Sequence, residues 1–562
     1  MSAFGTTVAV LGGGVGGLSA AQELAERSFD VTVYETRDCF GGKARSIEVP
    51  DSAPLGQKPL VGEHGFRFFP GFYHHITDTM KRIPYKENAN GVYDNLIETS
   101  ATLIASTTGP ETVASTETPS TPGEWIEMLQ PQIAGPELSS SEVRHFTERL
   151  FAFMTTCEDR RNEEYEYQSW WDFINADDRS DAYRKHLAQA TQALVALRPQ
   201  KASARTMGKI YVQLLRGQLD PTMSAEKILN GPTSEVWIDP WTEYLADLGV
   251  DLQSETPVRG IHSDGRRVTG VTVGTDTDQQ EIQADYYVVA VPVEVMTQLL
   301  DNDLRRGAPS LARLDRLETE WMNGIQFYLT DDVPVVEGHQ VHSDAPWALT
   351  SVSQPQFWEE DDIDDRGDDA INGSLSVIVS DWNSEGILYE KPARECTREE
   401  VKEEVWAQLK THLNTDTERR LTDDMLCDWF LDPAIVEHDD ENAGVWNQEP
   451  LLINTVGSLQ YRPEATTEME NLLLAADYVR TNTDLATMEC ANEAARRATN
   501  AIITRSGARA EQCELWELEE PGFLKPFRQQ DALRYRLGLP HPGDVVNRIR
   551  GFGRRDSPAV AD

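Results

Sequence analysis

The sequence predicts an α/β protein that contains a Rossmann-type sheet. Within the first 35 residues, an apolar run, a glycine-rich turn, a helical stretch and a second apolar run follow one another. Short apolar runs of this kind are typical of parallel strands that are covered on both faces. Further runs at residues 285–292 (DYYVVAVP) and 471–477 (NLLLAAD) predict more buried strands. Residues 311–454 mix strand and helix patterns, which predicts a mixed α+β region beside the sheet.

The first apolar run, residues 8–11 (VAVL), is followed by the pattern G-x-G-x-x-G. Gly12 allows a tight turn, Gly14 lets the backbone approach a pyrophosphate, and Gly17 lets helix and strand pack closely. The helix predicted over residues 18–27 would present free N–H groups to the phosphates. The sequence therefore predicts a dinucleotide site formed by Gly12, Gly14, Val15, Gly16 and Gly17.

An acid follows the second predicted strand. Residues 31–34 (VTVY) form this strand, and Glu35 stands at its end. An acid at this place accepts hydrogen bonds from a ribose hydroxyl. The order of strand, glycine turn, helix, strand and acid is much more specific than the glycines alone.

A second glycine pair, in the sequence Gly41-Gly42-Lys43-Ala44-Arg45-Ser46, comes soon after the acid. Here the chain resembles the large flavoprotein family of amine oxidases, protoporphyrinogen oxidases and plant-type carotenoid desaturases. That family carries a glycine pair and a basic residue at this place along FAD. The resemblance implies FAD as cofactor, with Gly41, Gly42, Lys43 and Arg45 beside it. Arg45 would contact the phosphates or the ribityl chain; the alternative is an ordinary surface arginine.

The resemblance extends to a strand, loop and helix near the C-terminus. Asp477 ends the apolar run 471–477, and Met488-Glu489-Cys490-Ala491 opens a helix. In carotenoid desaturases the acid binds the ribityl hydroxyls and the helix N-terminus faces the flavin, which implies contacts for Asp477, Thr487 and Met488. A helix N-terminus there stabilises negative charge on reduced flavin. Cys490 stands where the family usually has glycine, which puts a close approach of flavin at that residue in question.

A third element of the resemblance lies in the middle of the chain, where Val258 would place its backbone on the adenine side of FAD. The family builds two interleaved domains from a discontinuous chain. The resemblance therefore implies an FAD-binding domain from residues 1–105, 225–310 and 455–512. Residues 106–224 and 311–454 would form a mixed α+β substrate domain, and residues 513–562 a basic C-terminal tail.

The segment 61–73 (VGEHGFRFFPGFY) is dense in glycine, aromatic and basic residues. In related flavoproteins the equivalent stretch passes the reactive edge of the isoalloxazine ring. His64 and Arg67 are therefore candidate catalytic residues that would orient the substrate or stabilise reduced flavin. The alternative is that both hold the loop through hydrogen bonds and salt bridges.

Charge and composition limit the possible partners. The formal net charge is −43, which disfavours nucleic-acid binding and is typical of adaptation to molar salt, so we expect a halophilic source. No run of 18 apolar residues occurs, so we expect no membrane-spanning helix. The six cysteines have no C-x-x-C and no metal-ligand spacing, so we expect a protein of the reducing cytoplasm without a metal.

The tail is locally basic and contains interleaved apolar residues, unlike the rest of the chain. It would either contact anionic lipid at the inner face of the membrane or dock on the acidic body of the protein itself.

We expect an FAD-dependent oxidoreductase that transfers hydride to flavin N5. The leading hypothesis is desaturation or dehydrogenation of an apolar isoprenoid or carotenoid-type lipid, and bacterial dehydroxylases of squalene precursors are also similar. The alternative is a flavin amine oxidase acting on a small amine or amino acid. A third hypothesis is a flavin-binding assembly or regulatory protein without turnover. Oxygen and a quinone both remain open as electron acceptor.

Overall fold

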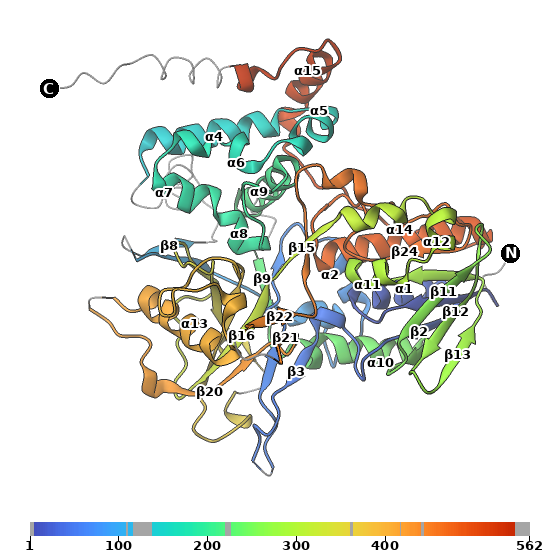
Figure 1. The fold of residues 1–562 in the computed structure, drawn as a ribbon, viewed down its shortest axis with the longest axis horizontal. Helices are drawn as coiled ribbons and strands as arrows, with labels where there is room; N and C mark the ends of the chain where they lie inside the picture. The colour runs from blue at the N-terminus through green and yellow to red at the C-terminus, as the bar shows by residue number, and fades with distance from the viewer. Residues whose placement is uncertain are drawn as a thin grey trace.

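The computed structural model describes residues 5–54, 56–107, 111–115, 138–219, 226–359, 363–415, 417–439 and 443–545. At its centre is a five-stranded parallel sheet with the strand order β10-β2-β1-β14-β24, the Rossmann-type sheet that the sequence predicts (Figure 1). The strands come from distant parts of the chain and pair with one another because the shared sheet buries their apolar side chains. They are β1 (Thr7–Leu11), β2 (Asp30–Tyr34), β10 (Asp251–Gln253), β14 (Tyr286–Val289) and β24 (Leu472–Leu474).

Two helices from opposite ends of the chain pack against each other beside this sheet, α1 (Val15–Ala25) and α14 (Met488–Ser506) (Figure 1). The Asn492 amide of α14 donates a hydrogen bond to Ser19 Oγ of α1 at 2.8 Å. Helix α1 follows the end of β1, and α14 follows the loop after β24. Both helix N-termini therefore lie at the carboxyl edge of the sheet, where ligands of open α/β sheets bind.

Smaller elements complete this part of the molecule. A three-stranded antiparallel sheet contains β11 (Val258–Ser263), β12 (Val268–Gly274) and β13 (Gln279–Ile282). The neighbouring helices are α2 (His75–Arg82), α10 (Asp239–Asp247), α11 (Val293–Leu299) and α12 (Asn302–Gly307). Three two-stranded sheets pair β3 (Ser46–Glu48) with β4 (Val61–Glu63), β15 (Glu318–Glu320) with β23 (Leu451–Ile453), and β21 (Ile435–Glu437) with β22 (Val445–Asn447). One three-stranded sheet has the order β5 (Phe69–Pro70), β9 (Glu226–Leu229) and β6 (Leu96–Glu98).

A second large sheet has seven strands in the order β20-β16-β19-β18-β17-β7-β8. Helix α13 (Arg398–Leu413) packs on it, with the rings of Trp406 and Phe327 5.1 Å apart. Strand β7 precedes the domain boundary expected at residue 105 and pairs with β17 of this sheet; the boundaries themselves stay predictions. The strands are β7 (Ala101–Ala105), β8 (Thr112–Ser115), β16 (Asn323–Leu329), β17 (Gln340–His342), β18 (Thr350–Ser353), β19 (Gly373–Val379) and β20 (Leu426–Leu431).

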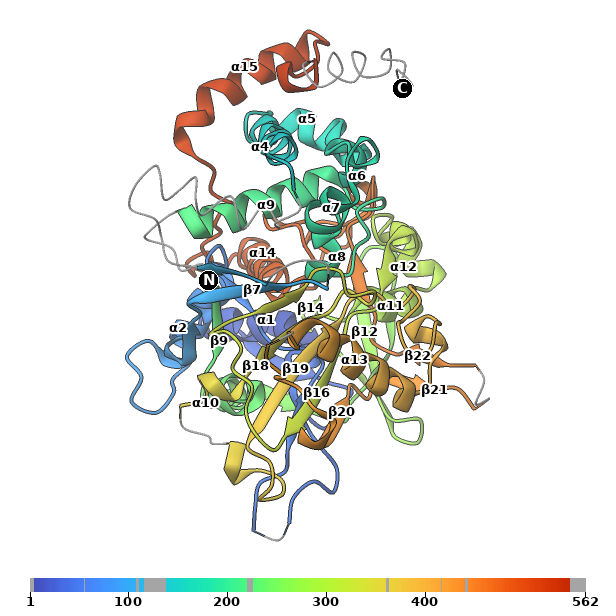
Figure 2. The same ribbon diagram turned by 90° about the vertical axis from the view of Figure 1, so that its left-hand side faces the viewer.

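A helical layer lies above both sheets (Figures 1 and 2). Its helices are α4 (Ser140–Met154), α5 (Glu158–Glu163), α6 (Trp170–Phe173), α7 (Asp181–Tyr183), α8 (Ala190–Val195) and α9 (Ala204–Leu219). Trp170 stacks on Tyr211 of α9 with ring centroids 4.9 Å apart. The tail helix α15 (Lys525–Arg536) docks on α5 at the outer end of this layer, so the described part of the tail contacts the body of the protein.

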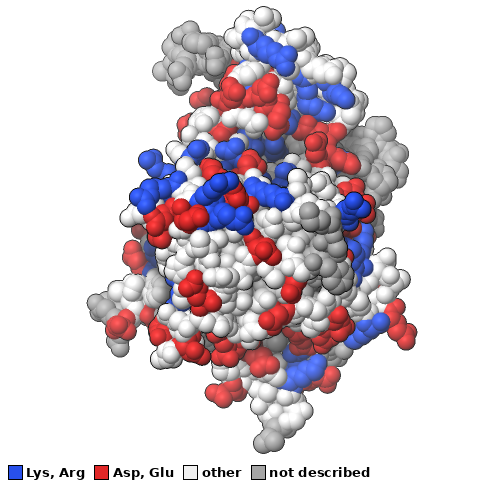
Figure 3. All heavy atoms as spheres, turned by 90° about the vertical axis from the view of Figure 1, so that its right-hand side faces the viewer, with Lys and Arg blue, Asp and Glu red and all other residues white. Residues whose placement is uncertain are grey.

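Acidic side chains are spread over the face shown in Figure 3, and basic side chains lie among them, both at one end of the molecule and in a band across its upper half. Across the described ranges, no helix has the length and apolar character needed to cross a membrane. The same residues contain no group of three His, Cys, Asp or Glu side chains able to hold a metal ion.

Candidate functional site

Two glycines of the turn between β1 and α1 leave no room for a side chain. Gly12 has a φ of +110°, and a Cβ atom there would lie 2.7 Å from Ala290 O. A Cβ atom on Gly17 would lie 1.9 Å from Gly12 O, so the first turn of α1 packs directly on the end of β1. Only glycine tolerates these positions. The geometry matches the turn and packing roles expected for Gly12 and Gly17.

Gly14 differs from its neighbours because the space beside it is open. A Cβ atom on Gly14 would meet nothing closer than Gly42 Cα, at 3.7 Å. Gly41 and Gly42 have left-handed φ values of +101° and +59°, and Gly41 N donates a hydrogen bond to Gly13 O at 2.9 Å. Two glycine segments that are separate in the sequence thus lie side by side at the end of β1, next to the N-terminus of α1. Exposed backbone at a helix N-terminus suits a bound phosphate.

Glu35 is buried beside the glycine turn. Its Oε2 accepts a hydrogen bond from Gly13 N at 2.7 Å. Thr256 N donates to the backbone oxygen of Glu35 at 2.7 Å, which brings the start of β11 next to the acid. Val258 is half-buried at that start. Glu35, predicted to bind a ribose hydroxyl, thus contacts the glycine turn predicted for the pyrophosphate, and the chain that leads to Val258 contacts Glu35.

Gly16 connects α1 to the C-terminal motif. A Cβ atom on Gly16 would lie 2.0 Å from Ala475 O, so α1 touches the segment that leads from β24 to Asp477. Asp477 is half-buried, and within the described residues nothing donates a hydrogen bond to its carboxylate. Thr487 caps α14 by accepting a hydrogen bond from Cys490 N at 3.2 Å, and Met488 is the first residue of the helix.

The Cys490 side chain is fully buried inside the loop that precedes α14. Its Sγ lies 3.4 Å from Asp477 O and 3.0 Å from Thr481 Oγ1. Burial raises the pKa of Cys490 to about 12, so the thiol stays protonated at neutral pH. The side chain that this protein has in place of the family's glycine therefore fills space within the loop.

The basic residues of the second glycine segment lie in different environments. Lys43 Nζ donates to Pro450 O and lies 3.8 Å from Glu294 Oε1. Arg45 is half-buried and donates to Gly42 O at 2.6 Å, but it has no salt bridge within the described part of the chain. Burial and the charge of Arg37 lower the pKa of Arg45, although the more distant acids Asp432 and Glu35 raise it. A ligand phosphate would give Arg45 a direct ionic partner.

Enclosed polar atoms without partners occur at the end of β4 and in the segment that follows it. Glu63 Oε1 accepts from Thr233 Oγ1 at 2.6 Å, but Glu63 Oε2 has no partner. Arg67 donates to Lys43 O through Nη2, while its Nε has no acceptor. Burial lowers the pKa of Arg67. Buried polar groups in folded proteins are normally satisfied, so the orphaned donor and acceptor point to a polar ligand or water at this place.

His64 is buried next to an acid that the sequence did not identify. Its Nδ1 lies 2.5 Å from Oδ2 of Asp432, the residue that follows β20.

The sequence did not identify Arg462 either, which donates to the backbone oxygens of Asp477, Tyr478 and Val479 and so holds the loop after β24. Glu294, beside Lys43, is a third residue of this kind. None of them belongs to a local motif, and Asp432 and Glu294 are two among 94 acidic residues, so the sequence offered no signal for them.

The residues present fit FAD. Arg45 offers a cation without a carboxylate partner, and Gly14 offers an open backbone for the phosphates. Asp477 offers a free carboxylate for hydroxyl groups, and Arg67 Nε offers an enclosed donor for a carbonyl or ring nitrogen. A flavin dinucleotide carries all the complementary groups. The individual contacts stay predictions.

Comparison with known proteins agrees with this geometry. A family model for flavin containing amine oxidoreductases matches residues 15–503. The 15-cis-phytoene desaturase of Synechococcus elongatus is 24% identical over 521 residues, which cover 89% of this chain and 96% of the relative. The zeta-carotene desaturase of a Synechocystis species is 24% identical over 344 residues, which cover 58% of this chain and 63% of the relative.

Solved structures of similar fold include amine oxidases. A putrescine oxidase bound to putrescine superposes with a TM-score of 0.59 at 14% identity, over 89% of this chain and 99% of the other. Cyclohexylamine oxidase from Brevibacterium oxydans has a TM-score of 0.59 at 12% identity, over the same shares of the two chains. These similarities establish a common fold. The chain belongs to the flavin-containing amine oxidoreductase family and is an FAD-dependent oxidoreductase.

Proposed function

We propose that this protein dehydrogenates an apolar isoprenoid or carotenoid-type lipid. The observation that carries the proposal is the similarity to 15-cis-phytoene desaturase, which extends over 96% of that relative. FAD supplies a hydride acceptor when it is bound. Arg45 would neutralise its phosphates, Glu35 and Asp477 would accept hydrogen bonds from its hydroxyl groups, and the N-terminus of α14 would stabilise negative charge on the reduced ring.

One aromatic side chain that could face a cationic substrate is occupied by other groups of the protein. Trp321 packs on Trp382 with ring centroids 5.5 Å apart, and the guanidinium of Arg394 lies over its ring. A cation–π contact with an amine needs a free ring face. Glu294 lies 3.8 Å from Lys43, so a cation of the protein itself faces that acid.

Anaerobic bleaching of bound flavin tests the proposal. The purified protein in molar KCl would be titrated with 15-cis-phytoene, with other neutral isoprenoid lipids and with a pool of soluble amines. We expect loss of the oxidised-flavin absorbance with lipids alone. Bleaching by amines alone would overturn the proposal in favour of an amine oxidase. Reoxidation of the bleached enzyme by oxygen or by a quinone would then identify the electron acceptor.

We also propose that the tail helix rests on an anionic lipid surface. Helix α15 is docked with its apolar side chains outward, since Asp531 is its one buried residue. Phe523, Leu533 and Leu537 have exposed fractions of 77%, 62% and 73%. Arg160 pairs with Asp531 at 3.1 Å, and both side chains are buried, so the helix is held in this orientation.

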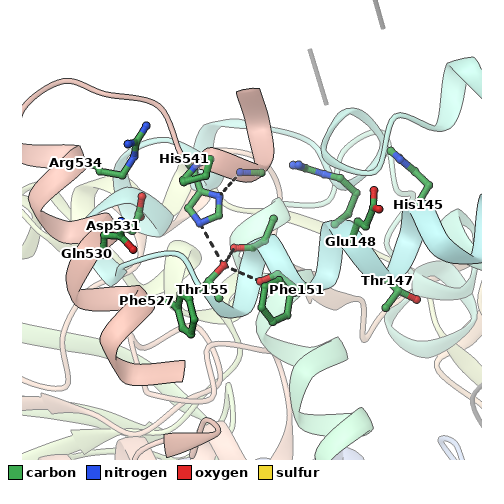
Figure 4. A pocket seen from close by; sticks show the side chains of 14 residues that line it. His145, Thr147, Glu148, Phe151, Thr155, Phe527, Gln530, Asp531, Arg534 and His541 are labelled. Carbon is green, nitrogen blue, oxygen red and sulfur yellow. Dashed lines mark hydrogen bonds between the residues drawn. The ribbon is translucent and has the colours of Figure 1, made fainter. Parts of the chain in front are cut away.

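A pocket of about 490 Å³ opens between α4 and the tail, away from the flavin site (Figure 4). Phe151 and Phe527 line it and add apolar surface next to α15. Lys525 and Arg536 add positive charge, whereas the chain as a whole carries −43. An anionic bilayer suits an apolar and basic surface, and basic residues contribute about 1 kcal/mol each near such a membrane.

Sedimentation with vesicles tests this surface, at the lowest KCl concentration that keeps the protein folded. We expect binding to phosphatidylglycerol vesicles, weaker binding to phosphatidylcholine vesicles, and loss of binding when Leu533 and Leu537 are both changed to Ser. Leu388→Ser, an exposed apolar residue elsewhere with a 52% exposed fraction, is the matched control. No binding to either vesicle, or a concentration-dependent dimer that the double variant abolishes, would contradict a lipid partner.

A further inference from the structure

One ring nitrogen of His64 lies against a buried acid, and the other has no partner within the described residues. Its Nδ1 lies 2.5 Å from Asp432 Oδ2, and its backbone oxygen accepts a hydrogen bond from Gly324 N at 2.6 Å. Nδ1 is fully enclosed by protein and makes a close ionic contact with Asp432 that is not aligned as a hydrogen bond, whereas Nε2 is not among the enclosed atoms and has no hydrogen-bond partner in the described residues. Nε2 is therefore the ring nitrogen that protein atoms do not close off.

Asp432 is itself held on several sides. Asn323 Nδ2 donates to Asp432 Oδ2 at 2.7 Å, and Ala434 N donates to Oδ1 at 3.0 Å. Asn447 Nδ2 in turn donates to Asn323 Oδ1 at 2.8 Å. Three elements, at the start of β16, after β20 and at the end of β22, thus fix the carboxylate that faces His64.

The charges around the pair favour a neutral imidazole beside an ionised carboxylate. Burial lowers the pKa of His64, Lys43 and Arg67 lower it further, and Asp432 raises it. Burial by itself would raise the pKa of Asp432. The contact with His64 and the hydrogen bonds from Ala434 and Asn323 nevertheless hold this pKa below its usual range. Arg398 donates to the backbone oxygen of Asp432 and adds a positive charge nearby. A neutral imidazole carries one N–H, and the carboxylate attracts that N–H to Nδ1, which leaves a lone pair on Nε2.

We propose that His64 Nε2 is the proton acceptor of the dehydrogenation, and that Asp432 is the positioning residue that keeps this nitrogen unprotonated and in place. The inference rests on the proposed function only in requiring a dehydrogenation. One substrate C–H bond breaks with its electron pair leaving as hydride to the cofactor. The adjacent C–H or N–H bond gives its proton to Nε2, and the electron pair of that bond becomes the new double bond. The imidazolium so formed is stabilised by Asp432 and returns its proton to water.

The protonation state can be measured without turnover. In ¹⁵N-histidine NMR spectra of the FAD-loaded protein in molar KCl, with His64→Gln used to assign the signal, we expect Nδ1 to carry the proton and Nε2 to be bare at pH 7. Asp432→Asn should move the proton to Nε2, because the amide can donate to Nδ1. A wild-type His64 that carries its proton on Nε2, or that is doubly protonated at pH 7, would overturn the inference.

Stopped-flow flavin reduction by 15-cis-phytoene provides the second readout. We expect His64→Gln and Asp432→Asn each to slow reduction by about 10²-fold or more, the usual contribution of general base catalysis. Asp432 raises the pKa of His64, so the acid limb of the pH profile should shift to lower pH in Asp432→Asn. Asp428→Asn, which changes a half-buried acid of the same strand, is the control that should leave both rate and profile unchanged.

The outcomes separate the two proposals. If lipids fail to bleach the flavin although His64 has the expected tautomer, the lipid substrate is rejected. The effect of His64→Gln would then be measured on flavin reduction by amines. Normal reduction rates in FAD-loaded His64→Gln would reject the proton acceptor while leaving the lipid substrate intact. A role of Asp432 in packing alone would lower stability without moving the acid limb, and Asp432→Glu should restore part of the rate only if the carboxylate itself is needed.

Discussion

Gly42 lies directly against Gly14: a Cβ atom added to Gly42 would come within 2.9 Å of Gly14 Cα. One glycine belongs to the dinucleotide motif and the other to the second glycine pair. Their contact makes the two motifs one continuous backbone surface at the end of β1. The phosphates of FAD need such a surface, so substitutions in either motif affect the same site.

Gly14→Ala and Gly17→Ala should have different consequences. The Cβ atom at Gly14 has room in the protein, so we expect a normal free energy of unfolding but at least about tenfold weaker FAD binding, or about 1.4 kcal/mol. The Cβ atom at Gly17 would lie 1.9 Å from Gly12 O, so we expect a loss of more than about 3 kcal/mol of stability. Flavin absorbance per protein and guanidinium denaturation measure the two effects. Full flavin occupancy in Gly14→Ala would contradict a phosphate contact at that residue.

Cys490→Gly should restore the family's usual residue without improving FAD binding, because the thiol points into the loop after β24. We expect a loss of about 1–2 kcal/mol from glycine in the helix and from the vacated space. Cys490→Ser, which can still donate to Asp477 O, should lose less. The measurements are denaturant unfolding and FAD titration of the apoprotein. A tenfold tighter affinity in the glycine variant would show that the thiol obstructs the flavin instead.

Arg462→Met should destabilise the protein by about 3–5 kcal/mol, because it removes one partner of a buried ion pair. Arg462 Nη1 lies 2.8 Å from Asp484 Oδ1, and both side chains are almost fully buried. Arg313→Met, at an exposed position, is the control and should change stability by less than about 0.5 kcal/mol. Denaturant unfolding at pH 7 compares the two. Equal stability of both variants would show that the pair makes no net contribution.

Asp484 should make stability fall in acid. Burial by itself would raise the pKa of Asp484, but the positive charges of Arg205 and Arg462 hold this pKa below its usual range. A carboxyl whose pKa is lower in the folded state stabilises that state above its unfolded pKa of about 4, and the stabilisation is lost as the pH falls toward the folded pKa. The free energy of unfolding should therefore drop below about pH 4. Asp484→Asn should be less stable at pH 7 but show a shallower drop, and an unchanged slope would exclude this group as a cause.

Salt should stabilise the protein strongly. With a net charge of −43, acidic side chains repel one another at low ionic strength and are screened in molar salt. We expect the melting temperature to rise steadily from about 0.1 M to about 3 M KCl. Differential scanning calorimetry over this range checks it, with an equal series of a neutral osmolyte as control. A melting temperature that is independent of KCl would contradict adaptation to salt.

The nucleotide-binding half of the fold was predictable because its signals are local. Gly12 and Gly17 must be glycine for backbone reasons, and the apolar runs at residues 8–11, 285–292 and 471–477 mark buried strands wherever they occur. The expected residues of the three motifs converge on one edge of the sheet. The region of the seven-stranded sheet has no such motif, because this sheet combines strands from residues 101 to 431, whose pairing depends on long-range contacts.

The sequence by itself determined the Rossmann-type sheet, the FAD motifs and the acidic character of the surface, since each follows from residue type and short spacing. Only the tertiary structure decided that Asp432 faces His64, that Arg462 holds the loop of Asp477, and that α15 buries Asp531 while its apolar side chains face outward. Each of these pairs joins residues far apart in the chain. Which acid among 94 meets which base depends on how strands and helices pack, and no local pattern contains that information.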